Sequence, residues 1–128
     1  MIYLDTSVML AHLLTESRRP GAGLWREQLV SSRLLEYEVW TRLHRSRADK
    51  RVAESARAAL ARLAFVEMSP HVLARALEPF SAPVRSLDAL HLATMEYLRS
   101  QNQPLSLAAY DDRLLAAARR LRIPIAAY

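Results

Sequence analysis

We infer the fold class first from Met1-Ile2-Tyr3-Leu4-Asp5-Thr6-Ser7-Val8, in which a short apolar run is followed at once by residues that cap helices. Residues 2–4 predict a buried strand, because the run is apolar and short and ends at polar residues. Asp5, Thr6 and Ser7 carry side-chain oxygens that can accept hydrogen bonds from the free N–H groups at a helix start. We therefore predict a strand, a tight turn and a helix that follows directly.

The rest of the chain repeats this alternation of short strands and amphipathic helices. Further strands are predicted at 30–33, 64–68, 105–109 and 124–126. Helices are predicted from Trp25 towards Val30, over 34–47, over 52–63, from Pro70, over 87–100 and after Asp111. Ser69 and Ser86 are the expected caps of the helices that start at Pro70 and Leu87. This alternation is typical of parallel βαβ units, so we expect an α/β fold, a three-layer α/β/α sandwich with a short central parallel sheet.

The composition fits one globular domain over residues 1–128. A chain of 128 residues, 52% hydrophobic and 24% charged, is long enough and apolar enough to bury a core. The absence of cysteine excludes disulfide scaffolds, thiolate metal sites and a cysteine nucleophile. Because Gly21 and Gly23 are the only glycines, the glycine-rich loops that cradle nucleotides are excluded as well.

The charge balance indicates an anionic partner. The net charge is +5, and all but one of the 18 basic residues are arginine, which suits bidentate recognition of phosphate or carboxylate. Nucleic acid and an acidic protein both fit this balance. No apolar run approaches the ~18 residues that span a bilayer, and the first residues lack the plan of a signal peptide. We therefore expect a soluble, cytoplasmic protein with no membrane partner.

Four acidic positions are candidates for one site. Asp5 and Asp111 directly follow predicted strands, and ligands of open parallel sheets bind beyond the carboxyl ends of the strands. Asp88 and Glu38 lie in the first turns of two predicted helices. Each acid taken alone is more commonly an ordinary helix cap. Together they would repel one another unless a cation neutralised them, and carboxylate oxygens favour Mg²⁺ or Mn²⁺.

Four segments, in this order, resemble the motifs of PIN domain nucleases. They are Met1–Val8, Leu34-Leu35-Glu36-Tyr37-Glu38-Val39, Leu87-Asp88-Ala89-Leu90-His91-Leu92-Ala93 and Ala109-Tyr110-Asp111-Asp112-Arg113-Leu114. The short length and the segment Asp88–Ala93 are similar to VapC-type ribonuclease toxins within that family. The resemblance covers nearly the whole chain.

The resemblance implies that Asp5, Glu38, Asp88 and Asp111 form a metal-binding catalytic site lined by Thr6 and Ser7. Glu36 and Glu38 lie about 200° apart around a helix, so only one can face this site, and the family pattern favours Glu38.

Three further residues are candidates for accessory roles. Asp112 is an outer ligand or a plain cap, and Arg113 could hold a phosphate or simply face solvent. His91 follows Asp88 by three positions, so it is a metal ligand or, more commonly for helical histidines, a buried partner. The basic residues Arg42, Arg45, Arg47, Lys50 and Arg51 could follow an RNA backbone.

The function implied by the resemblance is endonucleolytic cleavage of RNA with Mg²⁺ or Mn²⁺, by a homodimer held inactive by a cognate VapB-like antitoxin. Two alternatives remain: a PIN-like module that binds RNA or protein without catalysis, and a phosphoacceptor domain of the receiver type. The second needs an acidic pair after the first strand and a late lysine, whereas Asp5 is followed by Thr6 and the only lysine is Lys50. A dehalogenase-like phosphatase would need an aspartate in place of Ser7.

Overall fold

A computed structural model describes all 128 residues and contains a four-stranded parallel sheet. The strands are β1 (Ile2–Leu4), β2 (Leu29–Ser32), β3 (Ala64–Val66) and β4 (Ser106–Ala108). Their order across the sheet is β3-β2-β1-β4. Ile2 pairs with Leu29 on one side and with Ser106 on the other, which places β1 inside the sheet.

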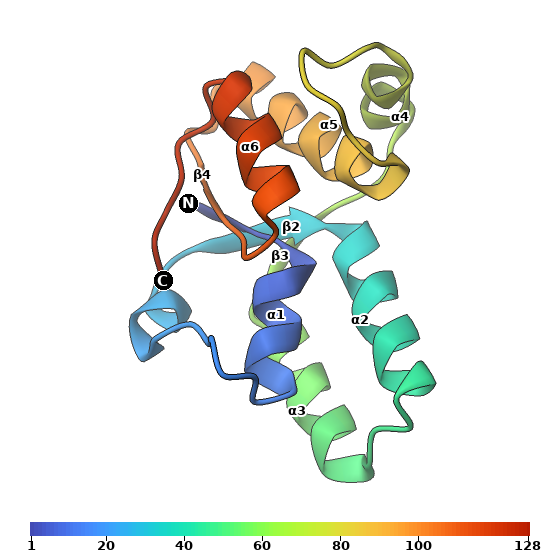
Figure 1. The fold of residues 1–128 in the computed structure, drawn as a ribbon, viewed down its shortest axis with the longest axis vertical. Helices are drawn as coiled ribbons and strands as arrows, with labels where there is room; N and C mark the ends of the chain where they lie inside the picture. Colours follow the sequence, from blue (N-terminus) through green and yellow to red (C-terminus); the bar gives the residue numbers. More distant parts are fainter.

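Helices cover both faces of this sheet (Figure 1). The elements are α1 (Thr6–Leu13), the 3-10 helix η1 (Ala22–Arg26), α2 (Arg33–Arg45), α3 (Lys50–Leu60), α4 (Pro70–Leu77), α5 (Ser86–Ser100) and α6 (Asp112–Arg120). In Figure 1, α1, α2 and α3 lie on one side of the strands, and α4, α5 and α6 lie on the other. The predicted three-layer α/β/α sandwich is therefore confirmed.

Side-chain alternation along β1 divides the core in two. Ile2 and Leu4 pack with α1, α2 and α3 in one cluster, whereas Tyr3 packs with α5 and α6 in the other. Successive strand residues point to opposite faces of a sheet, so a three-residue strand can supply both cores. Tyr3 and Leu4 are completely buried. The short strand is held by both helical layers.

The carboxyl ends of β1 and β4 are joined where acidic residues follow them. The Asp5 N–H donates to the carbonyl of Ala108, at 2.9 Å. Asp5 then caps α1 by accepting from the Ser7 N–H, and Asp111 caps α6 by accepting from the Arg113 and Leu114 N–H groups. Both predicted caps are confirmed, and they place two carboxylates at one edge of the sheet.

Several predicted boundaries are wrong. Ser86 is not a cap: it is the first residue of α5, which Arg85 precedes without a side-chain capping bond. Leu29, predicted to belong to a helix, starts β2. Residues 124–126 form no regular strand, because only Ile125 bridges to Leu107. Asp49 caps α3, which begins at Lys50, two residues before the predicted start.

None of the helices combines the length and the apolar character needed to cross a membrane.

Candidate functional site

Asp5 lies at the centre of the candidate site and is buried. Its carboxylate accepts hydrogen bonds from both the backbone N–H and the hydroxyl of Ser7. The Ser7 hydroxyl oxygen in turn accepts from the Tyr110 N–H at 2.9 Å. Ser7 therefore links the turn after β1 to the turn after β4, and it fixes the orientation of Asp5.

Glu38 reaches the same site from α2. Its Oε1 accepts from the Thr6 hydroxyl at 2.8 Å and is 2.7 Å from Nε2 of His91. Glu36 instead forms an ion pair with Arg33, at 3.2 Å. The structure thus turns Glu38, and not Glu36, towards the acids. The hydroxyls of Thr6 and Ser7 already hold carboxylates.

His91 connects Glu38 to the core. The ring is buried, with Nε2 facing Glu38 and also 3.9 Å from Oδ1 of Asp5, while Nδ1 is 2.7 Å from the Tyr3 hydroxyl. Because a carboxylate only accepts, Nε2 donates to Glu38, and in the neutral ring Nδ1 accepts from Tyr3. The Tyr3 oxygen itself accepts from the Ser32 N–H. A continuous hydrogen-bonded chain therefore runs from β2 to Glu38.

Asp88, in the first turn of α5, has an unusual carboxylate. Its Oδ2 is buried and has no hydrogen-bond partner. Burial raises the pKa of Asp88, and the negative charges of Asp111 and Asp5 raise it further. The charge of each acid therefore acts on the next, across the carboxyl edge of the sheet.

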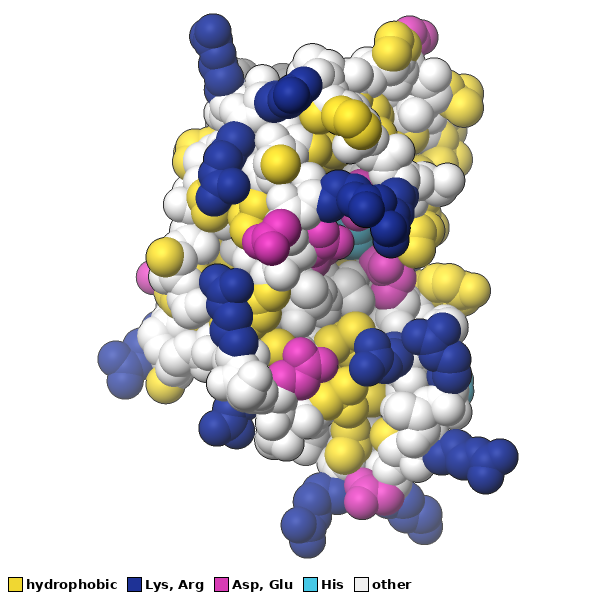
Figure 2. All heavy atoms as spheres, in the orientation of Figure 1, with side chains coloured by type: hydrophobic (Ala, Val, Ile, Leu, Met, Phe, Trp, Pro, Cys, Tyr) yellow, Lys and Arg dark blue, Asp and Glu magenta, His cyan; other side chains and the backbone are white.

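Burial is also the largest influence on the pKa values of Asp5 and His91, and it acts on them in opposite directions. Burial raises the pKa of Asp5, an effect that Glu38 reinforces and that His91 and Ser7 oppose. Burial alone would lower the pKa of His91, but the hydrogen bond to Glu38 and the charges of Asp5, Glu38 and Asp88 raise it overall. Figure 2 shows acidic side chains gathered on one face over a histidine, with basic side chains directly beside them.

The donor set suits a divalent cation, although the side chains do not surround one. As they lie, no three Asp, Glu or His groups are placed so that they could hold a metal ion together. One oxygen of Glu38, Oε1, is already hydrogen-bonded to Thr6 and His91 and is therefore not available as a metal ligand. The unpartnered Oδ2 of Asp88 and the mutual repulsion of the acids are what a bound cation would relieve. The chemistry of these oxygen donors therefore fits Mg²⁺ or Mn²⁺.

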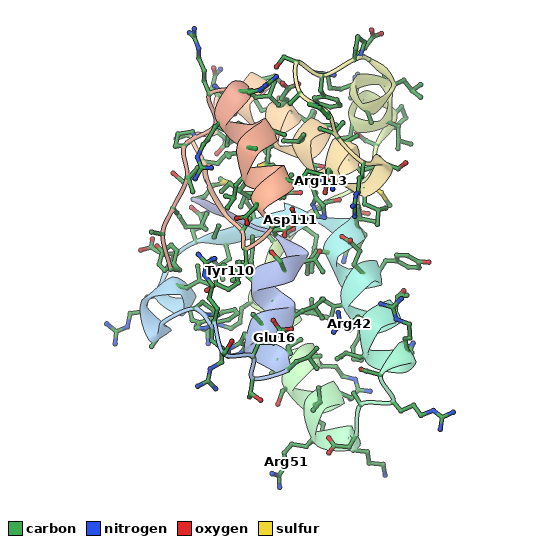
Figure 3. The ribbon with its side chains drawn as sticks, viewed as in Figure 1. Glu16, Arg42, Arg51, Tyr110, Asp111 and Arg113 are labelled. Carbon is green, nitrogen blue, oxygen red and sulfur yellow. The ribbon has the colours of Figure 1, made fainter.

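The remaining predicted residues lie at the rim of the site. Asp112 is exposed, and the cap of α6 is Asp111. Arg113 is exposed at the start of α6, close to Asp111 in Figure 3. Figure 3 also places Arg51 at the tip of the α2–α3 hairpin, away from Asp111. Tyr3 and Arg85 were not among the residues predicted for the site, and the only signal for Arg85 in the sequence is its position just before the Ser86-Leu87-Asp88 segment.

We predict that the protein becomes less stable as pH rises when metal is withheld. The pKa values of Asp5 and Asp88 in the fold are raised above 3.8, and that of His91 above 6.5, so the folded state binds more protons than the unfolded chain. Urea unfolding in EDTA should therefore give a free energy of unfolding that falls between about pH 5 and pH 8. A flat or rising profile would contradict this electrostatic picture.

Comparison with known proteins gives one family model and several relatives. The PIN domain model matches residues 2–120. Ribonuclease VapC35 of Mycobacterium tuberculosis is 30% identical over 99% of this chain and 96% of its own length. Ribonuclease VapC46 of the same organism is 34% identical over 98% of this chain and 96% of its own length. Among solved structures, a toxin-antitoxin complex from Klebsiella pneumoniae contains a similar chain, with a TM-score of 0.66, 20% identity and 91% coverage of both chains.

Proposed function

Because this chain belongs to the PIN domain family and is related to its VapC-type members, we propose that it is a Mg²⁺- or Mn²⁺-dependent endoribonuclease, the toxin of a toxin-antitoxin pair. The observation that carries the proposal is the buried, unpartnered Oδ2 of Asp88, beside carboxylates whose charges raise its pKa. A structural carboxylate would have found a donor, because an unsatisfied buried acceptor is costly. The Oδ2 atom of Asp88, which has no donor, is available to bind a cation.

The catalytic roles in this proposal belong to Asp5, Glu38, Asp88 and Asp111, which would hold the metal. When bound, the metal would bind the scissile phosphate, lower the pKa of an attacking water and offset the negative charge that builds up during hydrolysis.

The surrounding residues position these carboxylates. Ser7 fixes the rotation of Asp5, and Thr6 and His91 fix Glu38 through its Oε1, so that Oε2 is the oxygen we assign to the metal. A carboxylate that is not fully occupied by metal could accept the proton of the attacking water. We assign this role to Asp5, because burial raises its pKa.

The partners we propose follow from the relatives. Two are named ribonucleases, and the similar solved chain comes from a complex titled toxin-antitoxin. We therefore propose RNA as substrate, a VapB-like antitoxin as inhibitor and a homodimer as the working form. The surplus of arginine on the surface suits both RNA and an acidic inhibitor segment.

The test is cleavage of RNA by the purified protein. With total RNA and Mg²⁺ or Mn²⁺, we expect fragments that are absent in EDTA and that return when metal is restored in excess. Binding of the metal should also be detectable by calorimetry, because a bound metal raises the unfolding temperature of the protein. Metal binding without cleavage of any RNA would favour the non-catalytic binding module, and cleavage that persists in EDTA would rule out the metal site.

A further inference from the structure

A trough beside the acids is lined by arginines and contains no acidic residue. Its volume is about 440 Å³, and it lies between α6 and the segment that leads into α5. The lining residues are Ala82, Pro83, Val84, Arg85, Arg113, Ala116, Ala117 and Arg120. The walls are therefore apolar, and every charged group that faces the trough is positive.

The two arginines at one end of the trough have free guanidinium groups. Arg85 and Arg113 are exposed, and neither side chain forms a hydrogen bond or an ion pair within the protein. Arg120 differs, because it donates to the carbonyl of Ser81 at 2.9 Å and so ties α6 to the opposite wall. The first pair is available to a ligand, and Arg120 stabilises the far end.

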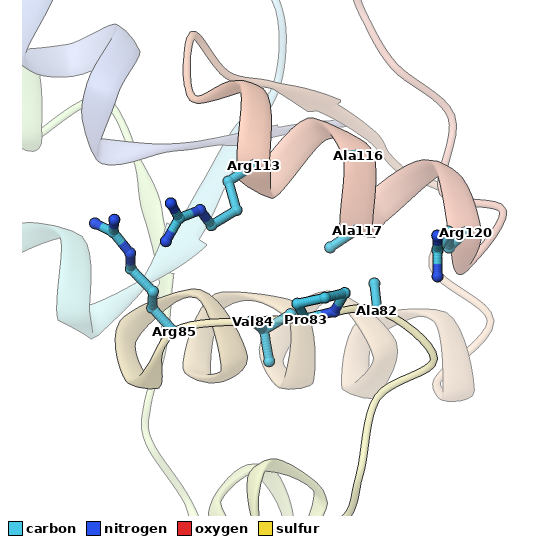
Figure 4. Close-up of a pocket in the computed structure, with 8 residues that line it drawn as sticks. All are labelled: Ala82, Pro83, Val84, Arg85, Arg113, Ala116, Ala117 and Arg120. Atoms are coloured by element: carbon cyan, nitrogen blue, oxygen red, sulfur yellow. The ribbon is translucent and has the colours of Figure 1, made fainter.

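The free pair lies near the acids at the starts of α5 and α6. Arg85 directly precedes α5, three residues before Asp88, and Arg113 follows Asp111 by two residues. In Figure 4, both side chains extend side by side in the same direction, one from each wall, whereas Arg120 lies at the other end of the trough. The seven residues from Arg113 to Arg120 span about 10 Å along the helix. The end of the trough that carries Arg85 and Arg113 is therefore the end nearer to Asp88 and Asp111.

We propose that this trough binds the sugar-phosphate backbone of single-stranded RNA, with Arg85 and Arg113 contacting phosphate next to the bond that is cleaved. This inference rests on the proposed function and assigns its substrate to one side of the site. Guanidinium groups recognise phosphate bidentately, and the apolar walls of alanine, proline and valine accept the less polar faces of ribose and base. A small anion could bind only the two arginines, whereas a nucleic-acid strand would also contact the apolar walls along the trough.

The experiment measures RNA binding and RNA cleavage separately. Binding of a labelled, mixed-sequence single-stranded RNA is followed by fluorescence anisotropy in EDTA, in an Asp5→Asn background that cannot cleave. The double variant Arg85→Ala/Arg113→Ala should weaken binding about tenfold at low salt and should reduce the slope of log K against log salt by about 1.4. In the otherwise native chain, the same pair of substitutions should raise the KM for RNA.

The matched control is Arg26→Ala/Arg119→Ala, which removes two exposed arginines outside the trough and lowers the net charge by two, as the trough variant does. An equal loss in the control would overturn the proposal in favour of diffuse charge. Arg85→Lys/Arg113→Lys should keep the salt slope but recover only part of the affinity, because lysine cannot bind phosphate bidentately.

Two further outcomes separate this inference from its alternatives. If the trough variant weakens binding of polyglutamate and leaves RNA binding unchanged, the trough is a docking site for an acidic protein segment and the inference is wrong. If the trough variant weakens RNA binding but the native chain cleaves no RNA with metal, the trough stands as an RNA site and the proposed nuclease function fails.

Discussion

Replacing Asp88 with asparagine should reduce RNA cleavage by at least about a hundredfold while making the metal-free protein more stable. A metal ion contributes several kcal/mol of charge stabilisation to such a reaction, and each 1.36 kcal/mol corresponds to about a factor of ten in rate. The amide keeps the shape of the carboxylate but binds cations weakly. It also removes a buried charge whose pKa is raised by Asp111 and Asp5, which is why the fold should gain stability.

Rates are measured under single-turnover conditions with excess Mg²⁺, and stability is measured by urea unfolding in EDTA. The matched control is Asp49→Asn, which changes an aspartate that caps α3 and lies outside the candidate site. Asparagine caps helices about as well as aspartate, so this variant should keep both activity and stability. An Asp88→Asn protein that cleaves RNA normally, or that is clearly less stable than the native chain, would contradict the role given to this carboxylate.

Replacing Tyr3 with phenylalanine should raise the Mg²⁺ concentration needed for half-maximal activity by about 10- to 100-fold, the usual cost of losing a group that orients a metal ligand. The Tyr3 hydroxyl contacts Nδ1 of His91, whose Nε2 holds Glu38. Burial raises the pKa of the hydroxyl, which keeps it protonated and able to donate. Without it, His91 is free to turn, and Glu38 loses its fixed orientation.

A purely structural role for Tyr3 would lower stability without changing the metal requirement. The substitution does leave the buried Ser32 N–H without its acceptor, which should cost about 1–3 kcal/mol of unfolding free energy. The activity measurement therefore varies Mg²⁺ at a temperature where both proteins are folded. Tyr97→Phe, in the last turn of α5 and with no hydrogen bond to its hydroxyl, is the control and should change neither quantity. An unchanged Mg²⁺ requirement for Tyr3→Phe would contradict a positioning role.

The positions of Asp5 and Asp111 could be predicted because they depend on local rules. Each follows a short apolar strand and precedes a helix, and parallel strands end at a shared edge. The capping bonds of both aspartates are equally local, since each joins groups within three residues. For the same reason the α/β architecture followed from the alternation of elements.

Other features needed the packed chain. Geometry on a single helix shows that Glu36 and Glu38 cannot face the same way, but only the seating of α2 against α1 puts Glu38 beside Thr6. Ser86 has the composition of a cap, yet the preceding loop enters α5 at Arg85. Residues 124–126 have strand composition, but their single bridge to β4 does not extend into a strand.

Apart from the strand predicted at 124–126, the sequence by itself determined the order of strands and helices and the two acids that follow β1 and β4 and cap the next helices, because those features depend on residues a few positions apart. Only the tertiary structure showed the contacts between residues that are distant in the sequence. Tyr3 and His91 are 88 residues apart, and the trough joins Arg85 to Arg113 across two helices. The physical reason is that a hydrogen bond or a shared charge acts over a few ångströms of space, whatever the length of chain between its partners.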